Sequence, residues 1–165
     1  MLLKVEEAVR VQQNNDQAVA FAQAGARLLE RVVVHGDSVA EALQWGKVNL
    51  EDEVGVKVNE ALGLDEGVSL RDAVGSFGKA CSLPGSFIGA ICALNMSNDL
   101  SEAVSSNILA SGDQCSRSQI IGALLGAQLG DESRLPSTWV AQTSAYAELK
   151  AQAEVVVNLR YGAAQ

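Results

Sequence analysis

The amino-acid sequence predicts an all-α protein, a bundle of about seven or eight helices. Apolar residues recur at the spacing of amphipathic helices, and no stretch alternates for long with the period of two that marks a strand. Aromatic residues make up only 4% of the chain, and the apolar content is mostly Ala, Leu and Val, which suits closely packed helices. We expect the 165 residues to form a single domain, residues 1–165.

The first half of the chain carries the clearest helix signals. The helices predicted there are residues 2–12, 18–33, 38–45, 50–62 and 72–77. Residues 18–33 are the most regular of these, because their apolar side chains repeat at helical spacing until Gly36 stops the helix. Ser38 and Glu41 have the spacing of a capping box, which predicts the start of the third helix.

The second half alternates helices with two informative loops, 81–86 and 111–116. The helices predicted there are residues 87–96, 100–110, 119–129 and a final helical region that begins at 135–139 and ends in a polar tail, 161–165. Gly122 and Gly126 lie four residues apart within one helix, where each glycine lowers helix stability by about 1 kcal/mol. Their repetition predicts that another backbone approaches that face closely.

Charge and cysteine content restrict the functions of the chain. The formal net charge is −8, and no cluster of Lys and Arg is present to hold a phosphate backbone, so we expect no nucleic-acid binding. The most apolar stretch, residues 87–94, is too short to span a membrane. Three cysteines without paired spacing indicate free thiols in a reducing compartment. The expected location is cytoplasmic.

The sharpest chemical feature is the turn that carries Asp113. Gly112 and Asp113 enter a helix through Cys115 and Ser116, next to amides that favour negative charge. Asp113 can therefore ligate a hard cation such as Mg²⁺, assisted by the Ser116 hydroxyl. It can equally be an ordinary helix cap, and the local sequence leaves both interpretations open.

Other candidates have simple structural explanations. His35 lies at a helix end without a partner nearby in sequence, which favours an interaction with the helix dipole over general-base catalysis. Cys115 has either some thiolate character at a helix start or none, as a packed bystander. Residues 85–87 open a helix after proline, so their first amides offer a place for a phosphate group, as any helix start does.

Several separated segments together resemble the ADP-ribosylglycohydrolase family. In that family a Gly-Gly-Asp-x-Asp-Thr turn leads into a small-residue helix that ends in Gly-Ala-x-x-Gly, and a Pro-x-x-Trp element follows. The matching segments here are Ala110-Ser111-Gly112-Asp113-Gln114-Cys115-Ser116-Arg117-Ser118, residues 120–130 and Leu135-Pro136-Ser137-Thr138-Trp139, with residues 83–87 and 101–104 resembling the preceding helix pair. The Cys-Ser-Arg form of the turn is most similar to the branch that includes the jellyfish J1 crystallins.

The resemblance implies a fold, a metal and a reaction. Members of the family are all-α proteins that bind two Mg²⁺ ions, or manganese in some, and hydrolyse the glycosidic bond between ADP-ribose and a protein side chain. Asp113 corresponds to the first carboxylate of the turn, a metal ligand, and Ser116 to its threonine hydroxyl. Cys115 stands where the family has a second carboxylate, and a sulfur ligand disfavours Mg²⁺.

The resemblance also implies that the chain corresponds to the C-terminal half of the family domain. The Thr-Asp-Asp-Thr-like cluster of the family's early half is absent from the sequence. We therefore expect an ADP-ribosylglycohydrolase-like chain with an incomplete site for ADP-ribose or an ADP-ribosylated substrate, completed by a second polypeptide or chain. The alternatives are a catalytically inactive, crystallin-like structural protein and an ADP-ribose-binding module without catalysis.

Overall fold

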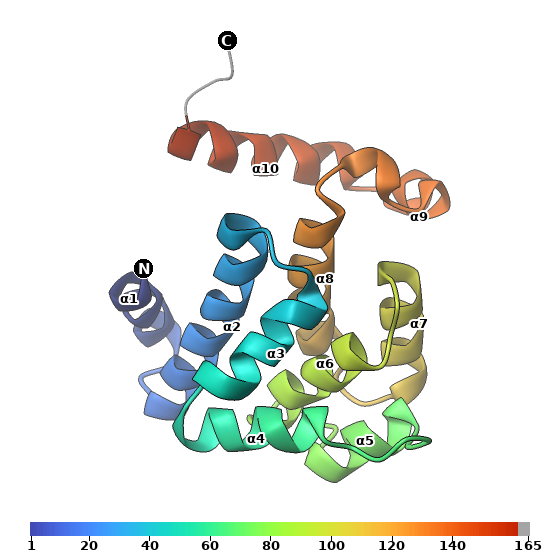
Figure 1. Ribbon diagram of the computed structural model, residues 1–165. Coiled ribbons are helices and arrows are strands. Elements are labelled where there is room, and N and C mark those ends of the chain that lie inside the picture. The colour runs from blue at the N-terminus through green and yellow to red at the C-terminus, as the bar shows by residue number, and fades with distance from the viewer. Residues whose placement is uncertain (162–165) are drawn as a thin grey trace. The chain divides into compact units, whose positions relative to one another are not determined.

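The computed structural model describes residues 1–161 and confirms the all-α class, since that range contains helices and no strand (Figure 1). The chain divides into two compact units, Met1–Gly130 and Asp131–Gln165. The helices of the first unit are α1 (Leu2–Gln12), α2 (Asp16–His35), α3 (Val39–Asn49), α4 (Asp52–Leu62), α5 (Leu70–Phe77), α6 (Gly85–Asn95), α7 (Leu100–Ala110) and α8 (Gln114–Leu129). Residues 162–165 of the predicted polar tail lie outside the described residues.

The second unit contains more helices than the sequence indicates. After a short 3₁₀ helix, Glu132–Arg134, come α9 (Ser137–Gln142) and α10 (Tyr146–Tyr161). The final region therefore consists of separate helices, because Thr143 adopts an extended backbone that interrupts it. The prediction of seven or eight helices is wrong in number: ten α-helices lie within the described residues.

Local capping signals fix the helix boundaries in the first unit. The Asn15 side chain accepts a hydrogen bond from the Ala18 amide and caps α2, which ends at Gly36 in the left-handed conformation with φ +76°. The capping box of α3 is present as predicted, with the Glu41 carboxylate accepting from the Ser38 amide and the Ser38 hydroxyl accepting from the Glu41 amide. These contacts satisfy amides that have no partner within the helix.

Helix α6 is the centre of the core. Every residue from Gly85 to Leu94 is buried, and the helix contacts α3, α4, α5, α7 and α8. At its start the Phe87 ring meets the Phe21 ring of α2 edge to face, with centroids 5.3 Å apart. Each large apolar side chain buried in this way contributes roughly 1.5–3 kcal/mol to stability. The sequence predicts this helix because it is apolar on all sides, the pattern of a buried helix.

One packing prediction is wrong. A Cβ atom added at Gly122 or Gly126 of α8 would meet no described atom within 4 Å, so no backbone approaches these glycines closely. Close approach occurs elsewhere, at Gly85, where a Cβ would lie 2.5 Å from the Gly78 carbonyl oxygen. This contact fixes the start of α6 against the end of α5.

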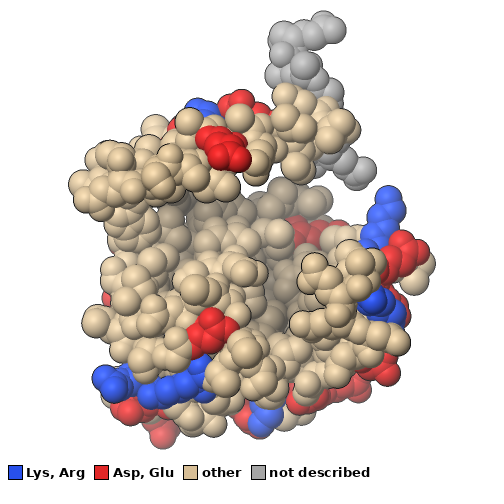
Figure 2. Space-filling model, turned by 180° about the vertical axis from the view of Figure 1, so that it is seen from behind, with Lys and Arg blue, Asp and Glu red and all other residues tan. Residues whose placement is uncertain are grey.

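Charged side chains are unevenly distributed on the face drawn in Figure 2. They gather along its lower margin, while the middle of this face carries few of them. None of the helices described is both long and apolar enough to cross a membrane.

Candidate functional site

The turn between α7 and α8 places Asp113 on a fixed piece of backbone. Ser111 and Gly112 both have positive φ, +65° and +74°. A Cβ on Gly112 would lie 2.3 Å from the Lys79 carbonyl oxygen, so only glycine fits there without displacement. The Asp113 amide donates to that same oxygen at 2.8 Å. The turn is therefore fixed to the segment that follows α5.

The two residues predicted to bind a metal, Asp113 and Ser116, lie together. Asp113 is the N-cap of α8: its carboxylate accepts from the Ser116 amide at 3.2 Å and from the Ser116 hydroxyl. These hydrogen bonds, chiefly that from the hydroxyl, hold the pKa of the Asp113 carboxyl below its ordinary value. Asp113 is half-buried, and its carboxylate is ionised at neutral pH.

Asp113 and Ser116 do not form a magnesium site by themselves. Within residues 1–161 no three His, Cys, Asp or Glu side chains are grouped so that they could hold a metal ion. Cys115, at the position of the family's second carboxylate, is exposed beside Asp113 and offers sulfur rather than the oxygen that Mg²⁺ prefers. Asp113 fits as one ligand, and the described residues do not complete the set. That Asp113 and Ser116 ligate a metal stays a prediction.

A buried arginine, Arg117, holds the Asp113 turn in place by hydrogen bonds, and the sequence did not predict this role. The Arg117 side chain is inaccessible to solvent, and its guanidinium donates to the Asn107 side-chain oxygen and to the Ser111 carbonyl oxygen. The Asn107 amide in turn donates to the Gln114 carbonyl oxygen at 3.1 Å and to the Ser118 hydroxyl at 2.9 Å. Burial lowers the pKa of Arg117. This network ties α7, the turn and the first turns of α8 together.

Helical spacing provides a signal for Arg117 in retrospect. Ile121 and Leu124, four and seven residues further on, are both buried, so Arg117 lies on the buried face of α8. Asn107 gives no comparable signal, because its role depends on the packing of α7 against α8.

The remaining candidates have ordinary surroundings. His35 is exposed at the end of α2. Cys92 is buried in α6, and burial raises the pKa of its thiol to about 12, so it stays protonated at neutral pH. Cys81 is exposed.

The chain is similar in sequence to known proteins. A family model described as ADP-ribosylglycohydrolase matches residues 2–165. The chain is 36% identical over 150 residues to Crystallin J1A of Tripedalia cystophora, a match covering 91% of this chain and 46% of that protein. It is 29% identical over 155 residues to Crystallin J1B of the same organism, covering 94% and 48%. The chain thus spans about half the length of these curated relatives. No solved structure matches it.

Proposed function

The chain belongs to the ADP-ribosylglycohydrolase family, and from that premise we propose that its protein hydrolyses ADP-ribosyl glycosidic bonds with Mg²⁺. The resemblance deduced from the Asp113 turn and the small-residue helix is confirmed by the family match. In this proposal the chain supplies one wall of the site, and its substrate is ADP-ribose attached to a protein side chain.

The observation that carries the proposal is that the Asp113 carboxylate is ionised and held in a fixed position. Its carboxylate is kept ionised by Ser116, stands on a turn that only glycine permits, and is supported from behind by Arg117 and Asn107. To cap the helix, Asp113 needs only the hydrogen bond between its carboxylate and the Ser116 amide. The additional buried network resembles the support that functional groups receive when their position must be held closely.

A magnesium ion would be bound jointly by Asp113 and Ser116 of this chain and by ligands from elsewhere. Asp113 would donate one carboxylate oxygen and Ser116 its hydroxyl oxygen, and the remaining ligands would come from another part of the protein or a second polypeptide. A magnesium ion bound at such a site stabilises developing negative charge and makes a coordinated water more acidic.

Substitution of Asp113 in a protein that contains the whole family domain tests the proposal. Asp113→Ser removes the carboxylate but keeps a good N-cap, so folding is preserved while Mg²⁺-dependent release of ADP-ribose from an ADP-ribosylated protein is lost. The matched control is Asp99→Ser, because Asp99 caps α7 through the Glu102 amide and lies outside the turn. Full turnover by Asp113→Ser, with the control also active, would show that Asp113 is not required.

A second candidate is a structural protein without catalysis. Both curated relatives are named crystallins, and Cys115 replaces a carboxylate of the family turn. Titration calorimetry of the 165-residue chain with ADP-ribose, with and without Mg²⁺, separates the candidates at the level of binding. Magnesium-dependent heat supports a functional half-site and ADP-ribose recognition. An inactive whole domain together with no heat from the folded chain supports the structural role.

A further inference from the structure

Arg117 of α8 is a buried cation whose hydrogen-bond partners in the described chain are neutral. Its side chain is inaccessible to solvent, and its guanidinium donates to the Asn107 side-chain oxygen, to the Asn107 carbonyl oxygen and to the Ser111 carbonyl oxygen. Its Nη1 atom is buried and has no partner among residues 1–161. Buried charges are normally paired and buried donors are normally bonded, so stability alone does not explain this residue.

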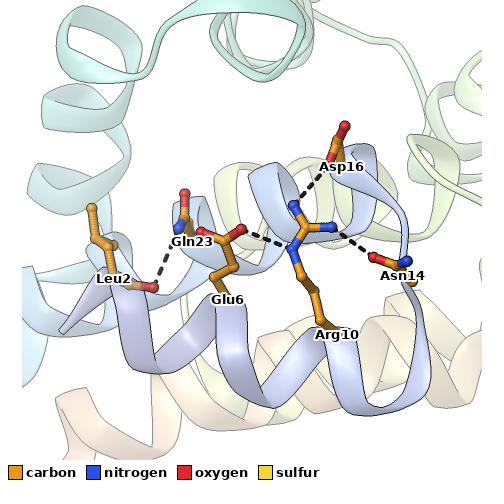
Figure 3. Close-up of polar contacts among 6 residues, drawn as sticks. All are labelled: Leu2, Glu6, Arg10, Asn14, Asp16 and Gln23. Carbon is orange, nitrogen blue, oxygen red and sulfur yellow. Dashed lines mark hydrogen bonds and ion pairs between the residues drawn. The ribbon is translucent and has the colours of Figure 1, made fainter.

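Arg10 of α1 shows an ordinary arrangement for comparison. Figure 3 shows its guanidinium donating to the carboxylates of Glu6 and Asp16, at 2.8 and 2.7 Å, and to the Asn14 side chain at 3.0 Å. The Arg10 side chain is 34% exposed, so its charge is both paired with anions and reached by water. Arg117 has neither form of compensation.

The acceptors of Arg117 lie on the segment that leads into the Asp113 turn. The Ser111 carbonyl belongs to a residue with φ +65°, a conformation that residues other than glycine rarely adopt. Asn107, in the last turn of α7, accepts from Arg117 and donates to the Gln114 carbonyl oxygen at 3.1 Å and to the Ser118 hydroxyl at 2.9 Å. Arg117 and Asn107 therefore connect the end of α7 and the strained residue to the start of α8.

A second attachment of the turn consists of main-chain contacts. The Asp113 amide donates to the Lys79 carbonyl oxygen at 2.8 Å, and a Cβ on Gly112 would lie 2.3 Å from the same oxygen. Asp113 therefore stands between two attachments, one to the segment after α5 and one to Arg117. Loss of the guanidinium removes the second and leaves the first, so the chain can keep its fold while the turn loses its fixed place.

We propose that Arg117 is a positioning residue, which holds the Asp113 carboxylate in the orientation that a ligand of the turn requires. It acts through the Ser111 carbonyl and Asn107, because its own side chain is not accessible to a ligand. The inference rests on the proposed function for the identity of the ligand, whereas the order of the turn can be measured without one. A purely structural role would instead appear as a loss of stability spread over the whole first unit.

Arg117→Met in the 165-residue chain tests the order of the turn. Methionine fills much of the space beside Gly89 but offers no donor, so the variant is expected to fold. The Asp113 amide should then exchange with deuterium about 10–100-fold faster than in the unmodified chain, measured in ¹H–¹⁵N spectra, because the hydrogen bonds of a charged group are lost. The amide of Ile91, in the middle of the buried helix α6, should change much less.

Two control variants separate the turn from general effects. Arg10→Met removes an arginine from a surface network, and Val58→Ala lowers stability at a buried site in α4. Both should leave the ratio of the Asp113 and Ile91 exchange rates as it is in the unmodified chain. Arg117→Lys keeps the charge but offers one nitrogen instead of a fork, so it should raise this ratio less than Arg117→Met does.

Activity measurements use a protein that contains the whole family domain. Arg117→Met should raise the Mg²⁺ concentration for half-maximal release of ADP-ribose about 10–100-fold, with little change in kcat at saturating Mg²⁺. Asp113→Ser, which removes the carboxylate itself, should be inactive at every Mg²⁺ concentration. An active Asp113→Ser protein would count against the proposed function, and the exchange measurement would still decide whether Arg117 orders the turn.

The inference is overturned by either of two results. The first is an unchanged ratio of Asp113 to Ile91 exchange in Arg117→Met and Arg117→Lys, or in Arg117→Lys alone where the methionine variant does not fold. The second is a wild-type dependence on Mg²⁺ in these variants while Asp113→Ser is inactive. A rise in the exchange ratio that is absent from Arg10→Met and Val58→Ala supports it.

Discussion

Arg117 is the residue whose surroundings are hardest to explain by stability alone. Its guanidinium is fully buried, its hydrogen-bonded partners are neutral oxygens, and its Nη1 atom has no partner within the described residues. Burying a charge without an ion pair is costly. What the molecule gains is a fixed turn, because Arg117 bonds both to Asn107 and to the carbonyl of Ser111, which has positive φ.

Gly89 of α6 provides the space that Arg117 occupies. A Cβ on Gly89 would lie 2.8 Å from Arg117 Cδ, an atom that cannot move away because the guanidinium beyond it is hydrogen-bonded. Gly89→Ala should therefore lower the free energy of unfolding by roughly 1–3 kcal/mol. Arg117→Ala should lower it by roughly 2–4 kcal/mol, through a cavity and unpaired polar groups.

A double-mutant cycle measured by urea unfolding checks this pairing. In the Arg117→Ala background, Gly89→Ala should cost nothing or stabilise, because the obstacle is gone and alanine favours the helix. Arg71→Ala, at an exposed arginine of α5, is the control for loss of an arginine. Additive effects of the two substitutions would contradict the packing argument.

At the scale of the element, α8 shows that a glycine pattern alone does not reveal its cause. Gly122 and Gly126 have open space around them, whereas Gly89 is confined. Gly122→Ala should therefore raise the free energy of unfolding by roughly 0.5–1 kcal/mol, since alanine favours the helix and restricts the unfolded chain. Urea unfolding beside Gly89→Ala measures the contrast. A loss of stability at Gly122 would mean that something contacts this face in solution.

The elements that the sequence predicts well are those whose signals are local. The capping box of α3 and the Asp113–Ser116 contact each join residues three positions apart, and the stop of α2 depends on the single residue Gly36. The start of α8 was predicted five residues late, at 119 rather than Gln114, because its first turns are polar and carry no apolar repeat. The Asn107 network depends on contacts between α7, the turn and α8, which no local pattern encodes.

At the scale of the whole molecule, α10 of the second unit carries several exposed apolar side chains. Leu149, Val155, Val156, Val157 and Leu159 are all more than half exposed. Leu149 and Val156 lie seven residues apart and so share a face of the helix. Exposed apolar side chains on one helix face favour contact with another protein surface.

The 165-residue chain is therefore expected to self-associate as its concentration rises, through α10. Val156→Glu combined with Leu159→Glu should return it to a monomer in sedimentation velocity, because a charged group resists transfer from water. Val48→Glu, at an exposed valine of α3, adds charge elsewhere and should leave the association intact. A monomer at every concentration would show that α10 needs no cover, and equal effects of both changes would point to net charge rather than to this surface.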